Sequence, residues 1–201
     1  LNWDKHPDSV IVPKWLSKMQ LENGVVYAGK VAVYVPKAEN DASKVSEITF
    51  KDGCTKIAHK ALFKNTDVEK VNIPASVKAI GGAAFAGCTN LQNIELPDRL
   101  KVLKSSMFNG CTSLKEFQFG KAIQKIERAA FKNCTGLKYL VVPDSVTRIG
   151  DEAFKGCTGL EYIKLSRNVE VLEDWLFHDC ESLTSIEIPS SVQRLRYWIV
   201  D

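Results

Sequence analysis

Six cysteines are the side chains of this chain best suited to chemistry, because thiols form disulfides, bind soft metals and act as nucleophiles. Cys54 stands apart, and the other five recur at intervals of 23 residues, at Cys88, Cys111, Cys134, Cys157 and Cys180. Stacked repeats would bring such thiols about 5 Å apart with parallel side chains, which is poor disulfide geometry. Zinc needs convergent ligands with short loops between them. The spacing therefore predicts a column of buried, reduced thiols, with no metal and no cofactor.

Other catalytic arrangements find little support. His6, His59 and His178 lie far apart in the chain and in different columns of the repeat, so no nucleophile–histidine–carboxylate arrangement can converge on them. Glu95 and Glu116 lie on adjacent predicted strands, and a glycosidase pair is conceivable there, although solvated surface charge is the simpler interpretation. The chain has no phosphate loop or dinucleotide motif. We predict that the protein is not an enzyme.

Charge and hydropathy restrict the partners. The 201 residues include 27 basic and 24 acidic side chains, a net charge of +3, which argues against nucleic acid because binding it requires a concentrated basic face. No apolar run is long enough to span a membrane, so no membrane insertion is expected within this chain.

The cysteine period extends to other columns. A phenylalanine precedes each periodic cysteine by three residues and a leucine follows it by three: Phe85, Phe108, Phe131, Phe154 and Phe177, and Leu91, Leu114, Leu137, Leu160 and Leu183. The 23-residue period holds from Val45 to Val200 without insertion or deletion. Units of this size cannot bury a core alone and must stack on their neighbours.

Each unit contains a stretch of the form L-x-x-I-x-I whose alternation predicts a half-buried strand. A second apolar pair follows, such as Val146 and Ile149, and then a compact turn or short helix, as in residues 151–157. The period predicts seven parallel strands at residues 45–50, 68–73, 91–96, 114–119, 137–142, 160–165 and 183–188.

The motif from Ile73 to Leu91 resembles the BspA-like leucine-rich repeat, since Pro74, Val77, Phe85 and Cys88 all fall in register with it. The resemblance covers roughly residues 45–201. It implies an α/β solenoid, a right-handed superhelix with the parallel sheet on one side and short helical or 3-10 turns on the other. It also implies a secreted or cell-surface protein with a role in adhesion, whose partner is a protein or glycan, including extracellular host molecules.

Residues 1–44 do not follow the period. Residues 13–21 could form a short amphipathic helix, and residues 24–36 have the pattern of a β-hairpin. Because the first repeat of a solenoid needs its open core covered, we interpret 1–44 as an N-terminal cap and 45–201 as the solenoid.

The outward positions of the predicted strands suggest a binding face. Tyr139 and Tyr162 fall on adjacent strands and should stack, with one apolar and three basic residues around them: Val141, Lys138, Lys164 and Arg167. Exposed tyrosines within a polar rim are typical of a contact surface. The alternative is that tyrosine simply suits a strand.

Trp175 and Trp198 form a second candidate surface near the C-terminal end, where their column otherwise holds Ala83, Ser106, Ala129 and Glu152. The two indoles either cap the solenoid or form an interface. Taken together, the sequence predicts a non-enzymatic module that mediates protein binding or cell-surface adhesion through its sheet face. The alternative is a structural spacer or stalk that displays other domains on the cell surface.

Overall fold

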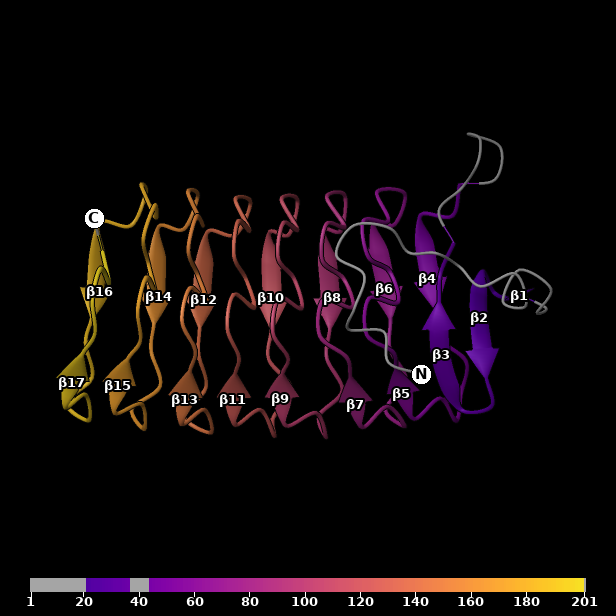
Figure 1. The fold of residues 1–201 in the computed structure, drawn as a ribbon, viewed down its shortest axis with the longest axis horizontal. Coiled ribbons are helices and arrows are strands. Elements are labelled where there is room, and N and C mark those ends of the chain that lie inside the picture. The colour runs from indigo at the N-terminus through magenta and orange to yellow at the C-terminus, as the bar shows by residue number, and fades with distance from the viewer. Residues whose placement is uncertain (1–20, 37–43, 201) are drawn as a thin grey trace.

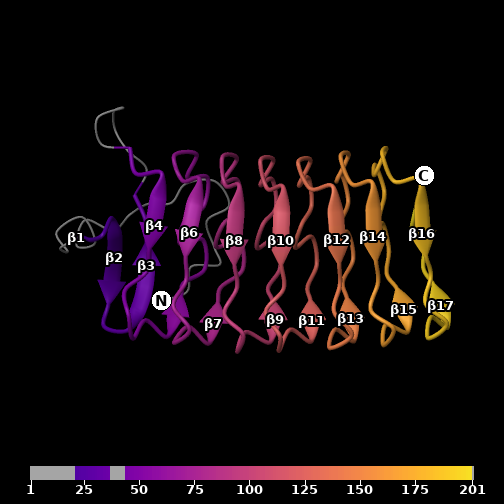
Figure 2. The same cartoon turned by 180° about the vertical axis from the view of Figure 1, so that it is seen from behind.

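The computed structural model describes residues 21–36 and 44–200, which form an elongated solenoid of stacked repeats (Figures 1 and 2). Each repeat contributes one strand of three residues, and we call these the long strands: β4 (Glu47–Thr49), β6 (Lys70–Asn72), β8 (Asn93–Glu95), β10 (Glu116–Gln118), β12 (Tyr139–Val141), β14 (Tyr162–Lys164) and β16 (Ser185–Glu187). Paired long strands run parallel, with partners 23 residues apart. The seven predicted strands are confirmed, while the right-handed superhelix stays a prediction.

A second row of two-residue strands, the short strands, follows the long ones around each turn of the solenoid (Figure 1). They arise from the second apolar pair of each repeat and also pair in parallel: β5 (Lys56–Ile57), β7 (Ala79–Ile80), β9 (Val102–Leu103), β11 (Lys125–Ile126), β13 (Arg148–Ile149), β15 (Val171–Leu172) and β17 (Arg194–Leu195). Among the described strands no pairing joins β10 to β12, β7 to β9, or β13 to β15.

The core lies between the strands and the turns. Most long strands bury their central residue and expose the two flanking ones, as β12 does with Leu140 between Tyr139 and Val141. The periodic phenylalanines are buried and stack along the solenoid, with ring centroids of Phe85 and Phe108 5.4 Å apart and of Phe154 and Phe177 5.6 Å apart. Offset aromatic stacking adds to the free energy gained from burial alone.

The predicted helical turns are wrong, because the described residues contain no helix. Each turn instead includes two left-handed residues four positions apart, such as Glu152 with φ 57° and Gly156 with φ 71°. Left-handed backbone is incompatible with a right-handed helix. The next repeat holds this conformation, since the backbone N–H of Glu152 donates to the carbonyl of Asp174 at 2.9 Å and that of Gly156 to His178 at 2.8 Å.

The segment before the first long strand forms an antiparallel meander of β1 (Leu21–Glu22), β2 (Val25–Ala28) and β3 (Val31–Tyr34). Asn23 and Gly24, both with positive φ, form the first turn, which is the conformation that an Asn-Gly hairpin prefers. β3 then pairs in parallel with β5, so the meander continues the row of short strands. The predicted helix at 13–21 lies outside the described residues except for Leu21, which belongs to β1.

Candidate binding face

The outward side chains of the long strands form one surface, which we call the sheet face. Strand register places Tyr139 opposite Tyr162 and Val141 opposite Lys164. Tyr139 is 62% exposed, Val141 58% and Tyr162 37%, although most large apolar residues of the repeat are buried. The structure therefore brings together the three apolar residues predicted from the sequence.

Tyr139 is held by a polar contact rather than by ring stacking. Its hydroxyl donates a hydrogen bond of 2.7 Å to Oε2 of Glu161, and Lys138 Nζ lies 3.2 Å from Oε1 of the same carboxylate. The Tyr139 hydroxyl and the Lys138 ammonium hold the pKa of Glu161 below its ordinary value. The pKa of Tyr139 is raised because its hydroxyl donates a hydrogen bond to the negatively charged Glu161. Ring contacts within 21–36 and 44–200 do not include the pair Tyr139 and Tyr162, so the stacking expected from the sequence is not observed.

Arg167, the third predicted basic residue, has a structural partner. Its Nε and Nη2 lie 2.8 Å and 2.6 Å from Oδ2 of Asp144, and its backbone N–H donates to Oδ1 at 2.9 Å. The guanidinium holds the pKa of Asp144 below its usual range. Arg167 also lines a shallow hollow of about 470 Å³ with Asn168, Glu170 and Gln193. It lies after β14, beyond the tyrosine pair, and joins two neighbouring repeats.

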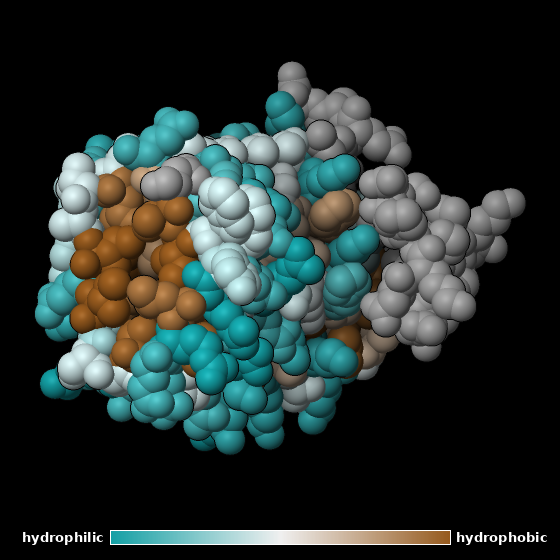
Figure 3. Space-filling model, turned by 60° about the vertical axis from the view of Figure 1, so that its left-hand side comes forward, coloured by the Kyte–Doolittle hydropathy of each residue, from teal (hydrophilic) through white to brown (hydrophobic). Residues whose placement is uncertain are grey.

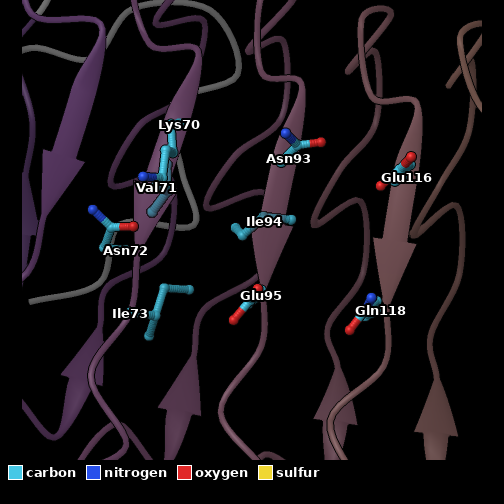
Figure 4. A pocket seen from close by; sticks show the side chains of 9 residues that line it. All are labelled: Lys70, Val71, Asn72, Ile73, Asn93, Ile94, Glu95, Glu116 and Gln118. Carbon is cyan, nitrogen blue, oxygen red and sulfur yellow. The ribbon is translucent and has the colours of Figure 1, made fainter.

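A second hollow of about 470 Å³ lies on the N-terminal half of the sheet face, across β6, β8 and β10 (Figure 4). Six outward polar side chains surround it: Lys70, Asn72, Asn93, Glu95, Glu116 and Gln118. The sequence places Glu95 and Glu116 on adjacent strands but does not indicate a hollow there, although the strand positions that identify the tyrosines also place these six residues on the face. Isolated amides and carboxylates on a solvent-facing strand carry no distinctive signal, whereas exposed tyrosines do.

The two tryptophans of the second candidate surface are in contact. The rings of Trp175 and Trp198 stack with centroids 5.9 Å apart, and Lys155 Nζ lies 4.4 Å from the Trp175 ring centroid. Trp198 remains 64% exposed, and Leu195 is 57% exposed. Figure 3 shows an apolar patch at this C-terminal end of the solenoid. Trp198 therefore stacks on Trp175, and apolar side chains such as Leu195 remain exposed at the same end of the solenoid.

The cysteines form the predicted column. All six thiols are free and buried, and Sγ of Cys111 donates to the carbonyl of Phe85 at 3.2 Å. Cys88, Cys134, Cys157 and Cys180 repeat this bond at 3.1 to 3.2 Å, each to the residue 26 positions earlier. Burial raises the pKa of the Cys88 thiol to about 12. It likewise raises the pKa values of the thiols of Cys111, Cys134 and Cys157. Buried thiols with raised pKa values are poor nucleophiles.

No cluster of three or more histidine, cysteine, aspartate or glutamate side chains within the described residues is arranged to hold a metal ion. The same residues contain no helix that is long and apolar enough to cross a membrane.

Comparison with known proteins supports the repeat assignment. The family model described as "BspA type Leucine rich repeat region" matches residues 37–138 and 124–199, with six copies. Among solved structures, the chain is similar to a leucine-rich repeat protein of T. pallidum, with 31% identity, a TM-score of 0.76, and coverage of 84% of this chain and 78% of that one. A leucine-rich repeat protein of Bacteroides ovatus is 29% identical with a TM-score of 0.71, over 90% of this chain and 54% of that one.

The likeness extends to more distant proteins. The pneumococcal vaccine antigen PcpA shares the fold at 21% identity and a TM-score of 0.51, over 87% of this chain and 41% of that one. No curated protein matches the chain. The family model covers most of the sequence, and its repeats coincide with the long strands, the short strands and the turns described above. The chain therefore belongs to the BspA-type leucine-rich-repeat family.

Proposed function

We propose that this chain is a non-enzymatic binding module whose contact surface is the sheet face. Proteins of the leucine-rich-repeat family generally mediate protein interactions. The observation that carries the proposal is the exposure of Tyr139, Val141 and Tyr162 side by side on adjacent strands, although most large apolar side chains of the repeat are buried. Lys138 and Lys164 provide a polar rim, an arrangement common at binding surfaces.

The tyrosines suit this role because they are already positioned. Glu161 fixes the Tyr139 hydroxyl, so the ring loses less conformational freedom when a partner covers it. The parallel register fixes the distance between the two tyrosine backbones at one strand spacing, about 4.8 Å. A rigid surface of this kind favours affinity because little ordering remains to be done on binding.

The proposal extends to location and to the class of partner. We propose that the module acts outside the cell or on its surface, in adhesion to a protein or glycan. This extension rests on the resemblance to the BspA-like family, and an export signal encoded in the same gene is the observation that would test it. The competing function is a spacer that displays other domains, since a rigid stack of repeats can also hold domains apart.

An array of extracellular-matrix proteins, serum proteins and glycans separates these functions. The proposal predicts a captured ligand that is lost in the double variant Tyr139→Ala/Tyr162→Ala while the melting temperature stays unchanged. Tyr139→Phe keeps the ring but loses the bond to Glu161, so it should retain the ligand with a weaker affinity. Loss of the ligand only in Tyr197→Ala would move the contact to the C-terminal end, where that side chain is exposed. Equal behaviour of all variants would favour the spacer.

A further inference from the structure

The sheet face divides into two halves of different chemistry. On β4, β6, β8 and β10 the outward positions are polar and carry one basic and three acidic residues: Lys70, and Glu47, Glu95 and Glu116. Lys70 Nζ lies 2.9 Å from Glu47, so these two charges compensate each other. Glu95 and Glu116 form no ion pair with another described residue. On β12 and β14 the outward positions hold Tyr139, Val141, Tyr162 and Lys164.

The two uncompensated carboxylates belong to the hollow across β6, β8 and β10. Register places Glu116 opposite Asn93, and Gln118 opposite Glu95, so the carboxylates are diagonal neighbours on adjacent strands. Their backbones are about 8 Å apart, given one strand spacing across and two residues along. Figure 4 shows the four polar side chains on two neighbouring strands around the hollow. A cationic group entering between β8 and β10 would be attracted by both carboxylates.

The amides supply the second part of the recognition. Asn93 and Gln118 each carry donor and acceptor groups beside the carboxylates. Amide side chains of this kind match the N–H and C=O groups of a peptide backbone, which are strong donors and acceptors themselves. The acidic charge repels phosphate, so nucleic acid does not fit this half of the face.

The distance between the two halves fixes the spacing in a ligand. The middle of the β8–β10 pair lies two strand spacings, about 10 Å, from the middle of the β12–β14 pair. An extended chain covers that distance in about three residues. A ligand that crosses the strands can therefore place one side chain between Glu95 and Glu116 and another over Tyr139 and Tyr162.

We infer that the sheet face recognises an extended peptide carrying a lysine or arginine about three residues from an aromatic or aliphatic side chain. The basic side chain occupies the hollow at Glu95 and Glu116, and the apolar one packs on Tyr139, Val141 and Tyr162. The inference rests on the proposed function, because it specifies the ligand of the same face. Charge complementarity at the unpaired carboxylates favours a cationic peptide over a neutral glycan.

Fluorescence polarisation with capped synthetic peptides tests this inference. The probe carries arginine and tryptophan about three residues apart, and a matched peptide replaces arginine by neutral citrulline. We expect the arginine peptide to bind the intact protein, to weaken roughly fivefold to tenfold in Glu95→Gln/Glu116→Gln, and to weaken with added salt. Glu181→Gln removes the same kind of charge from an exposed turn outside both hollows and should leave binding unchanged.

The outcomes separate this inference from the proposed function. Equal affinity for the arginine and citrulline peptides, or no binding of either, would overturn the peptide assignment. Binding of neutral oligosaccharides that is lost with Tyr139→Ala/Tyr162→Ala would overturn it too, while the sheet face would remain the contact surface. A ligand from the array that is indifferent to the tyrosine variants would remove the proposed function itself.

Discussion

The hydroxyl of Tyr139 and the carboxylate of Glu161 are joined by a 2.7 Å hydrogen bond between neighbouring repeats, and Lys138 lies 3.2 Å from the same carboxylate. The bond joins Tyr139, the more exposed of the two tyrosines, to the residue that directly precedes β14 in the next repeat. The residue predicted to contact a partner is thus also a link between two repeats.

Removing the hydrogen bond between Tyr139 and Glu161 should change the titration of Glu161 and leave the fold intact. In Tyr139→Phe the pKa of Glu161 should rise toward its ordinary value, because one of the two groups that stabilise the carboxylate is gone. Since this pKa is depressed in the folded protein, the interaction stabilises the fold above the ordinary pKa of glutamate and is lost as the pH falls through the depressed value. Carboxyl NMR titration measures the shift. An unchanged Glu161 titration would show that Lys138 alone determines it.

The buried thiols should be protected from reagents. Ellman's reagent should find almost no reactive thiol in the native protein and all six after denaturation, because every cysteine is free and buried. Rapid reaction of one or more thiols under native conditions, or fewer than six in denaturant, would contradict the column of reduced cysteines.

The same thiols should make the fold sensitive to alkali. The pKa of Cys88 is about 12 in the folded protein against 9.0 for an exposed thiol. A raised pKa means that the contribution of the neutral thiol is fully present below pH 9.0 and is lost as the pH rises toward about 12. Urea unfolding at increasing pH should show this decline, and Cys88→Ala should reduce its slope. Equal slopes in both proteins would argue that other groups control alkaline unfolding.

A left-handed position in the turns offers a conformational test. Gly110 has φ 75°, and a methyl group there would meet nothing closer than 3.8 Å, so substitution costs backbone strain and not a clash. Gly110→Ala should lower the free energy of unfolding by about 1 kcal/mol. Gly110→Asn is the matched control, since Asn133 occupies the same column with φ 58° and asparagine tolerates this conformation. Equal losses for alanine and asparagine would rule out the conformational explanation.

The phenylalanine stack should dominate stability. Phe131 is fully buried, and its ring lies 5.4 Å from that of Phe108 and 5.7 Å from that of Phe154. Phe131→Ala should cost about 4 kcal/mol, from lost burial and the cavity left behind. Phe131→Leu keeps most of the volume and should cost clearly less. Chemical denaturation gives both values, and a small effect of the alanine variant would indicate that the stack collapses around the gap.

The strands and the core could be predicted because each depends on a pattern that repeats. Alternation identified Leu140 as buried and Tyr139 as exposed, and the constant period placed Tyr139 beside Tyr162. The turns could not be predicted in the same way. Glu152 and Trp175 have no intrinsic preference for positive φ, and their conformation is imposed by hydrogen bonds to the next repeat. The local pattern of apolar and polar residues does not indicate these hydrogen bonds to the next repeat.

The candidate site was predictable only in part, for a related reason. The period determines which residues share a face, but not which side chains pair with each other. The period places Arg167 near the tyrosines but does not show that it forms an ion pair with Asp144 one repeat earlier. The strand pattern indicates only surface charge at Glu95 and Glu116, because neither the hollow that they line nor the pairing of Lys70 with Glu47 can be derived from the period.

The gaps in strand pairing fall at different repeat boundaries in the two rows of strands. Where the long strands β10 and β12 are not paired, the short strands β11 and β13 are paired. Where the short strands β7 and β9 are not paired, the long strands β6 and β8 are, and where β13 and β15 are not paired, β12 and β14 are. From β4 to β17, therefore, every boundary between repeats is bridged by paired strands in at least one of the two rows. Wherever one row of strands is unpaired, the other row still joins the same two repeats. Local unfolding of one repeat therefore has to break strand pairing with its neighbour, so neighbouring repeats should unfold together and not one at a time.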